Sequence, residues 1–289
     1  NVIGTIIFLI FMPYFKMLVL AISPEGDIVQ QIANAHTAFN LLNTIIFLPF
    51  ISLFATLVTK IVPGEEKIIK KGPVFLDQRV LNTPSVAITL ARKEVIRMGE
   101  LARENLENAM IAFVTKDESI IKEVFDVEDV IDELEKSITA YLSQISQKGL
   151  TKENSLIVTS LLHAVNDIER VGDHAHNIVE YAEACIADNI SFSPFATKEL
   201  SEMHNLVSET FSISIQALKE NDLVKAEQVI KNESIIDNME KSLRRSHIGR
   251  LNEGQCLVHA GVIFLDLISN LERVGDHSHN IASVVKQEI

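Results

Sequence analysis

Pairs of acidic residues spaced four apart occur at four places in this chain. At these places, and nowhere else, a glutamate is followed four positions later by an aspartate. Since an α-helix completes a turn in about 3.6 residues, each pair would set two carboxylates on one helix face, where they repel each other. Grouped carboxylates of this kind are typical ligands of hard cations. The eight residues are Glu128, Asp132, Glu169, Asp173, Glu233, Asp237, Glu272 and Asp276.

The four pairs hold equivalent places in two related halves of the chain. DIERVGDHAHNI at 167–178 and NLERVGDHSHNI at 270–281 agree at nine of twelve positions, with an offset of 103 residues. VEDVIDELEKSI at 127–138 matches NESIIDNMEKSL at 232–243 with an offset of 105, and a third pair of segments, MGELAREN and MHNLVSET, shares that offset. A nearly constant offset through three successive segments indicates a tandem duplication.

The elements that must position these carboxylates are helices. From Ser85 onward the apolar residues follow a helical period, and a chain with no tryptophan and three tyrosines does not favour a β-rich fold. Helix-breaking positions divide this region into six helices, which predicts two three-helix bundles over 85–190 and 191–289. The expected breaks are Thr115–Lys116, Lys148–Gly149, Ser191–Pro194, Asn221 and Gly249–Gly254, and the expected helix starts include Thr151 and Asp222.

If the second and third helices of each half pack antiparallel, each bundle gathers four of the carboxylates into one cluster. Such clusters suit Mg²⁺, Mn²⁺, iron or Ca²⁺, and zinc is less favoured because no thiolate accompanies them. His176 and His279 lie seven residues after Glu169 and Glu272, on the same helix stripe, where they could add a nitrogen ligand. The sequence therefore predicts a metal cluster in each bundle.

The competing interpretation is a solvated acidic face, in which Arg170 and Arg273 pair with neighbouring carboxylates. Repetition of the motif four times in register favours the metal interpretation over this one. Gly172 and Gly275 fit both, because a small residue lets another segment approach closely.

Two apolar stretches near the start of the chain have the length of membrane spans. Val2–Ile22 and Leu41–Thr59 are each about as long as the ~20 residues that cross a bilayer. The loop 23–40 lacks Lys and Arg, whereas several lysines follow the second stretch, so the positive-inside rule places the remainder in the cytoplasm. We predict a multi-pass protein of the cell membrane, in contact with lipid, with a transmembrane segment at 1–62 and a linker at 63–84.

A polar stripe leads into the second apolar stretch. His36, Asn40, Asn43 and Thr44 fall at i, i+4, i+7 and i+8, so they share one helix face. Polar groups at membrane depth tend to face a protein interior or a substrate path, which makes these four residues candidates for a transport path. Hydrogen bonding between helices or exposure at the interface is the alternative.

Charge and missing motifs argue against several other classes of function. Residues 1–60 carry no net charge, so the net charge of −13 lies in the rest of the chain, and an acidic domain without a basic stripe is a poor binder of nucleic acid. We find no nucleophile constellation and no glycine-rich phosphate loop. Helical di-iron enzymes use Glu-x-x-His pairs, but glycine lies three residues after Glu169 and Glu272. We expect neither an enzyme nor a nucleic-acid partner.

The region 85–289 strongly resembles the PhoU family, with ERVGDH followed by HNI in each third helix and Glu-x-x-x-Asp on the second and third helices. The resemblance implies multinuclear metal clusters held by the eight carboxylates, with Fe, Mn, Mg or Zn as the metal, and a role in regulating phosphate uptake. One difference between the halves is that Asp167-Ile168 precedes the first Glu-Arg and Asn270-Leu271 the second. This leaves open whether the two sites bind metal equally.

NVIGT at the start of the chain and AHTAFN at 35–40 resemble the second repeat of the sodium/phosphate cotransporter family, although the Gln-Ser-Ser-Ser signature of that family is absent. We interpret the chain as the C-terminal part of a sodium-dependent phosphate transporter with a cytoplasmic regulatory domain. Na⁺ and inorganic phosphate would be partners of the full-length protein. The alternative is a membrane-tethered PhoU-like regulator without transport activity of its own. The metal, the regulatory signal and the oligomeric state, including a homo-oligomer, are left open.

Overall fold

The structure of the protein is a computed structural model that describes residues 5, 8–24, 26–52, 54, 70–254 and 256–287. These residues form helices and connecting turns, without a strand among them. The chain divides into two compact units, Asn1–Ile68 and Ile69–Ile289. The all-helical class predicted from the sequence is therefore confirmed.

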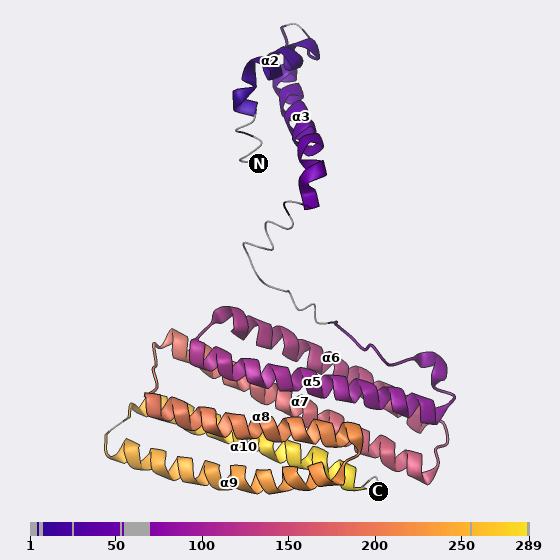
Figure 1. Cartoon of the computed structure of the whole chain (residues 1–289), viewed down its shortest axis with the longest axis vertical. Helices are drawn as coiled ribbons and strands as arrows, with labels where there is room; N and C mark the ends of the chain where they lie inside the picture. Colours follow the sequence, from indigo (N-terminus) through magenta and orange to yellow (C-terminus); the bar gives the residue numbers. More distant parts are fainter. Residues whose placement is uncertain are drawn as a thin grey trace. The chain divides into compact units, whose positions relative to one another are not determined.

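The second unit contains two sets of three long helices (Figure 1). The first bundle consists of α5 (Pro84–Thr115), α6 (Glu118–Ser146) and α7 (Lys152–Ala187), and the second of α8 (Pro194–Glu220), α9 (Leu223–Asn252) and α10 (Val258–Gln287). Within each bundle all three helices pack on one another, and between the bundles α7 packs on α10 and α5 on α8. The buried apolar side chains of both bundles form one continuous core.

Side chains at the helix ends explain where the helices begin and end. The backbone N–H of Asn154 donates to Thr151 Oγ1 at 3.2 Å, which caps the start of α7. Asn221 ends α8 in the left-handed conformation, with a φ of 53°, which asparagine tolerates better than most residues. Asp222 then caps α9, because its Oδ1 accepts the backbone N–H of Val224 at 2.8 Å.

The described part of the predicted linker, residues 70–83, lies on the first bundle and is called the strap below. Glu94 of α5 is fully buried and holds the strap, since its Oε2 accepts the backbone N–H groups of Val74 at 2.8 Å and Phe75 at 2.5 Å. Arg97 Nε donates to the other carboxylate oxygen of Glu94 at 2.6 Å. The strap is therefore bound to the middle of α5 through Glu94, in addition to its covalent connection to the first residue of that helix.

The first unit contains α2 (Met12–Ala21), α3 (Ile28–Phe47) and the 3₁₀ turn η1 (Leu48–Phe50). α2 has 10 residues, so it is about 15 Å long, half of the ~30 Å hydrocarbon core of a bilayer. Pro13 lies in its first turn, where the missing N–H interrupts helical hydrogen bonding from the preceding residues. Pro49 lies in η1, directly after the end of α3.

α3 has 20 residues, but it includes several glutamines and asparagines and a histidine among its apolar side chains. None of the described helices combines the length and the apolar character needed to cross a membrane. The described residues therefore do not support the two predicted membrane spans, and the predicted multi-pass location in the cell membrane is wrong. The prediction took Pro13 and Pro49 to be tolerated within membrane helices, whereas α2 begins and α3 ends beside these prolines. Parts of the predicted spans, at 2–4, 6–7, 53 and 55–59, lie outside the described residues.

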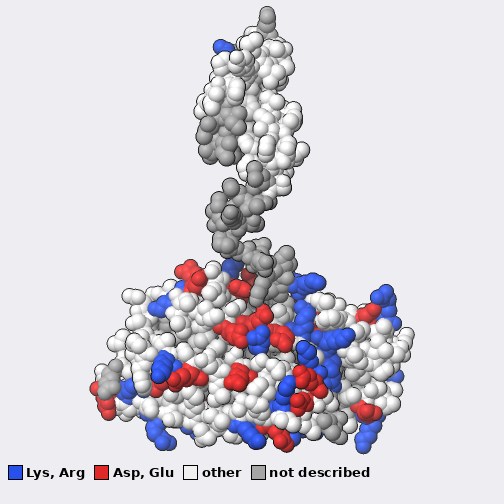
Figure 2. All heavy atoms as spheres, in the orientation of Figure 1, with Lys and Arg blue, Asp and Glu red and all other residues white. Residues whose placement is uncertain are grey.

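The two units differ in surface charge. On the face that Figure 2 shows, the described residues of the first unit include few charged side chains. On the visible face of the second unit, acidic and basic side chains are interspersed.

Candidate metal centre

A close approach between α9 and α10 brings acidic residues of the second bundle together. Gly275 lies against Ile236, and a Cβ built on this glycine would be 3.2 Å from Ile236 Cγ2, closer than an ordinary contact. Asp276 follows Gly275 in α10, and Asp237 follows Ile236 in α9. The glycine therefore lets the two helices approach at the level of these carboxylates.

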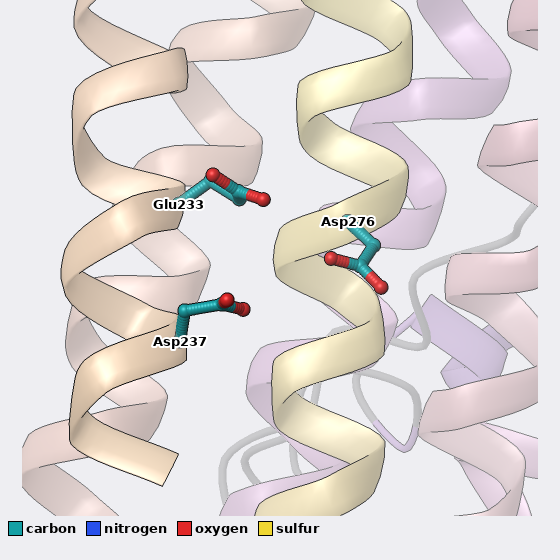
Figure 3. Close-up of side chains that lie close together, drawn as sticks. All are labelled: Glu233, Asp237 and Asp276. Carbon is teal, nitrogen blue, oxygen red and sulfur yellow. The ribbon is translucent and has the colours of Figure 1, made fainter. Parts of the chain in front are cut away.

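Three carboxylates of the second bundle converge at this level. Glu233, Asp237 and Asp276 each place one carboxylate oxygen within 4.8 Å of the other two. Figure 3 shows Glu233 and Asp237 projecting from α9 toward α10, with Asp276 on the facing turn of α10. Partial burial and the charges of Asp237 and Glu233 raise the pKa of Asp276 above its usual value. The three groups therefore repel one another, and a bound cation would relieve that repulsion.

Other side chains of the second bundle border this trio. Burial, followed by the charges of the neighbouring carboxylates, raises the pKa of Glu272. His279 Nδ1 lies 3.6 Å from Glu233 Oε2, so the predicted additional ligand is next to the trio. Lys241, which is exposed, places Nζ 3.1 Å from Asp237 Oδ2. A cation would compete with this lysine for one carboxylate oxygen.

The first bundle repeats the close helix contact but not the convergence. A Cβ on Gly172 would lie 3.3 Å from Ile131 Cγ2, as at the equivalent contact of the second bundle. Arg170 Nη1 donates to Asp173 Oδ2 at 2.9 Å. In the described part of this bundle, no three ligand atoms lie as close together as those of the second bundle. Asp173 therefore forms an ion pair with Arg170, as the alternative interpretation of a solvated acidic face predicted.

Burial and neighbouring charges also disfavour the ionised forms of other acidic residues in the first bundle. Burial, followed by the charge of Asp132, raises the pKa of Glu128. Burial also raises the pKa of Glu169, whose buried Oε2 accepts no hydrogen bond. His176 lies 3.5 Å from an oxygen of Glu128 and 3.5 Å from one of Glu180, and these three residues line a surface hollow of about 340 Å³.

The four predicted transport-path residues all lie on α3. Asn40 Nδ2 is 3.3 Å from His36 Nδ1, and Thr44 Oγ1 donates to the carbonyl oxygen of Asn40 at 2.9 Å. Asn43 Oδ1 is buried and accepts no hydrogen bond from the residues that the structure describes. The assignment of this stripe to a transport path stays a prediction.

Comparison with known proteins shows which family the two bundles represent. The model of the PhoU domain matches residues 95–182 and 200–285, one match in each bundle. The chain belongs to the PhoU domain family. The resemblance and the PhoU-like fold predicted from the sequence are confirmed.

Individual PhoU relatives agree with the family match. PhoU homolog 1 of Thermotoga maritima, a phosphate-specific transport system accessory protein, is 31% identical over 200 residues, which cover 68% of this chain and 85% of that protein. The crystal structure of PhoU from Pseudomonas aeruginosa has a TM-score of 0.64 at 22% identity and covers 68% of this chain and 93% of that chain. The putative inorganic phosphate export protein YjbB of Escherichia coli is 21% identical over 220 residues, or 74% of this chain and 40% of that protein. These matches do not show membership of the sodium/phosphate cotransporter family.

The donor sets of both PhoU repeats fit a hard or borderline cation. The second repeat offers three carboxylate oxygens close together, with an imidazole beside them. The first repeat has a buried carboxylate oxygen, Glu169 Oε2, that accepts no hydrogen bond, although Arg170 Nε lies 3.5 Å from it. Sets dominated by oxygen, with nitrogen at the edge, suit Mg²⁺, Mn²⁺ or iron.

Sequence reasoning missed a group of residues between the two PhoU repeats. His174 and His277 received no role, yet their ring centroids lie 5.6 Å apart where α7 meets α10. The available signal was a His-x-x-Asn pair, which recurs at 174–177 and at 277–280.

Proposed function

We propose that this chain is a PhoU-like regulator of phosphate transport whose bundles bind divalent cations through their carboxylate clusters. The observation that carries the metal part is the convergence of Glu233, Asp237 and Asp276 within a PhoU repeat. The name of the Thermotoga maritima relative, a phosphate-specific transport system accessory protein, supports the link to phosphate. The proposed role is binding and regulation, without catalysis.

The residues of the second cluster come from two helices, and this gives them a mechanical role. Glu233 and Asp237 would hold the cation from α9, and Asp276 would hold it from α10, with His279 beside them. When bound, the cation supplies the positive charge that these carboxylates lack. The two helices would then be held together at a level where carboxylate repulsion otherwise opposes their approach.

Manganese titration tests the metal part of the proposal. Metal-free full-length protein is titrated with Mn²⁺ by isothermal calorimetry, and the Asp237→Asn/Asp276→Asn variant should lose the binding of the second bundle. Glu227→Gln is the matched control, because Glu227 is an exposed carboxylate of α9 outside the cluster. Equal Mn²⁺ binding by the double variant and the unsubstituted chain would contradict the site assignment.

Phosphate uptake in cells tests the regulatory part. Uptake of radiolabelled phosphate is compared between cells with the gene, cells without it, and cells that produce the Asp237→Asn/Asp276→Asn variant. If cation binding carries the regulation, the variant should resemble the deletion. Unchanged uptake after deletion would contradict a role in phosphate transport, whatever metal the protein binds.

A second candidate function is that of a regulatory part within a sodium-dependent phosphate transporter. The alignment with YjbB favours it, because only 40% of that putative phosphate export protein aligns with this chain. A PhoU-like segment can therefore be one part of a longer phosphate export protein. Sodium and inorganic phosphate would then be partners of the whole protein. Phosphate flux that depends on a sodium gradient, and that disappears when the gene is deleted, would support this candidate over a separate regulator.

A further inference from the structure

The contact between α7 and α10 contains two equivalent sets of hydrogen bonds, which we call the seam. His277 Nδ1 donates to Asp167 Oδ1 at 2.8 Å, and Asn280 Nδ2 donates to the same oxygen at 3.0 Å. In the second set the acceptor is on α10 and the donors are on α7, at the equivalent positions of the two repeats. His174 Nδ1 lies 2.8 Å and Asn177 Nδ2 3.1 Å from Asn270 Oδ1.

The two sets have nearly the same geometry but different charge. Asp167 and Asn270 are equivalent residues of the two PhoU repeats, and each accepts from a histidine and an asparagine of the other repeat. Only the set at Asp167 contains a carboxylate. Hydrogen bonds to a charged acceptor are roughly twice as strong as those to a neutral one. The turn of α10 at 276–280 is therefore held against α7 more firmly than the turn of α7 at 173–177 is held against α10.

The seam and the metal clusters share the same helix turns. In α10, His277 directly follows Asp276, and Asn280 directly follows His279. Successive helical residues point about 100° apart, so the seam occupies one side of this turn and the cluster another. A rotation or shift of α10 at the seam must also move Asp276 relative to α9. Residues next to metal ligands that are fixed by hydrogen bonds can in turn fix the orientation of those ligands.

We propose that Asp167 is a positioning residue for the cluster of the other bundle, and that its carboxylate makes the second cluster bind cations more tightly than the first. This inference rests on the proposed cation-binding function. It agrees with the described side chains, because the trio of the second bundle converges while Asp173 in the first bundle is paired with Arg170. It also assigns a consequence to the difference between Asp167 and Asn270.

Exchanging the two seam residues tests the proposal. Asp167→Asn, Asn270→Asp and the double exchange keep the size of the side chain and the accepting oxygen. The exchange is not fully neutral, because Asn270 Nδ2 also donates to the carbonyl oxygen of Asp266 at 2.9 Å, which aspartate cannot do. The double exchange leaves the composition and net charge of the chain unchanged. Its unfolding midpoint is measured beside its metal affinities, so that a loss of general stability is separated from a change in positioning.

Each cluster is measured alone in these proteins. Asp132→Asn/Asp173→Asn disables the first cluster, Asp237→Asn/Asp276→Asn disables the second, and the remaining cluster of the full chain is titrated with Mn²⁺. The second cluster should bind about fivefold more tightly than the first, the ratio expected when one of the two bonds in the set, that of the histidine next to the ligand aspartate, is charge-assisted instead of neutral. The double exchange should reverse this order. Equal affinities, or an order that the exchange does not change, would overturn the proposal.

A measurement without metal separates this inference from the proposed function. In metal-free protein, Asp167→Asn should increase backbone hydrogen exchange of α10 at 276–280, and the double exchange should move the stronger protection to α7 at 173–177. Unchanged exchange would show that Asp167 does not hold α10. Absence of Mn²⁺ binding to the unsubstituted chain would instead overturn the cation-binding function, and with it the claim of unequal affinities.

Discussion

Replacing Gly275 by alanine tests whether the glycine sets the distance between α9 and α10. The added Cβ would lie 3.2 Å from Ile236 Cγ2 and 3.3 Å from Ile236 Cδ1, in the interior of the bundle. Overpacking of this kind costs about 1–3 kcal/mol, whereas alanine in place of a helical glycine gains about 0.5–1 kcal/mol. We expect a net loss of about 0–2.5 kcal/mol in the free energy of unfolding.

Gly249→Ala is the matched control, because Gly249 also lies in a helix but has no side chain within 4 Å of the added Cβ. It should stabilise the protein by about 0.5–1 kcal/mol. Urea unfolding followed by circular dichroism at the helix band gives both values by linear extrapolation. The difference between the two variants, about 1–3 kcal/mol, is the steric cost alone.

A double-mutant cycle identifies the source of that cost. With Ile236→Ala in the background, the Gly275→Ala change should lose its penalty and behave like the control, since the atoms that it meets belong to Ile236. If Gly275→Ala is as stable as Gly249→Ala in the unsubstituted background, Ile236 does not limit the approach of the helices. The glycine would then have no part in bringing Asp276 to Asp237.

Two further predictions concern pH and the strap. In metal-free protein the cluster carboxyls with raised pKa should lose their contribution to the free energy of unfolding as the pH rises above the ordinary carboxyl range, because they then give up protons that the folded state retains while the same groups in the unfolded chain are already ionised. Burial lowers the pKa of His174, His204 and His247, which acts in the opposite direction, so the parent is compared with Glu272→Gln/Asp276→Asn over the same pH range. Saturating Mn²⁺, which compensates the ionised groups, should remove this loss from the parent, and a metal-free parent that loses no more stability than the variant would contradict the assigned pKa directions. Glu94→Ala should cost about 1–3 kcal/mol, since it removes the acceptor of the backbone N–H groups of Val74 and Phe75, and hydrogen exchange of these two amides should rise. Unchanged exchange would show that Glu94 does not hold the strap, and the exposed Glu118→Ala serves as the control. The cluster carboxyls with raised pKa, on which the pH prediction above depends, are Glu128, Glu169, Glu272 and Asp276.

The helices and their limits could be predicted because their causes are local. Thr151 and Asp222 cap helices through backbone N–H groups two or three residues away, so a short stretch of sequence contains both partners. The duplication was equally readable, because both copies retain their motifs in register. Hydropathy failed for the first unit, where Pro13 and Pro49 interrupt stretches whose average composition is apolar.

Side-chain geometry at the candidate site was only partly accessible from the sequence. The spacing placed Glu233 and Asp237 on one face, but it could not decide whether an arginine pairs with a carboxylate, as Arg170 does with Asp173. The seam was out of reach for another reason. Asp167 and His277 are 110 residues apart, and only the packing of α7 on α10 makes them neighbours.

The attachment of the strap determines where a mechanical load enters the second unit. A pull on the chain before residue 70 would reach Glu94 and Arg97 in the interior of α5, and Tyr141 of α6 through its hydrogen bond to Asp77 at 2.8 Å. The strap is thus bound to the middle of α5 and to α6, and not at Pro84 alone. A force on the strap would act on both of these helices.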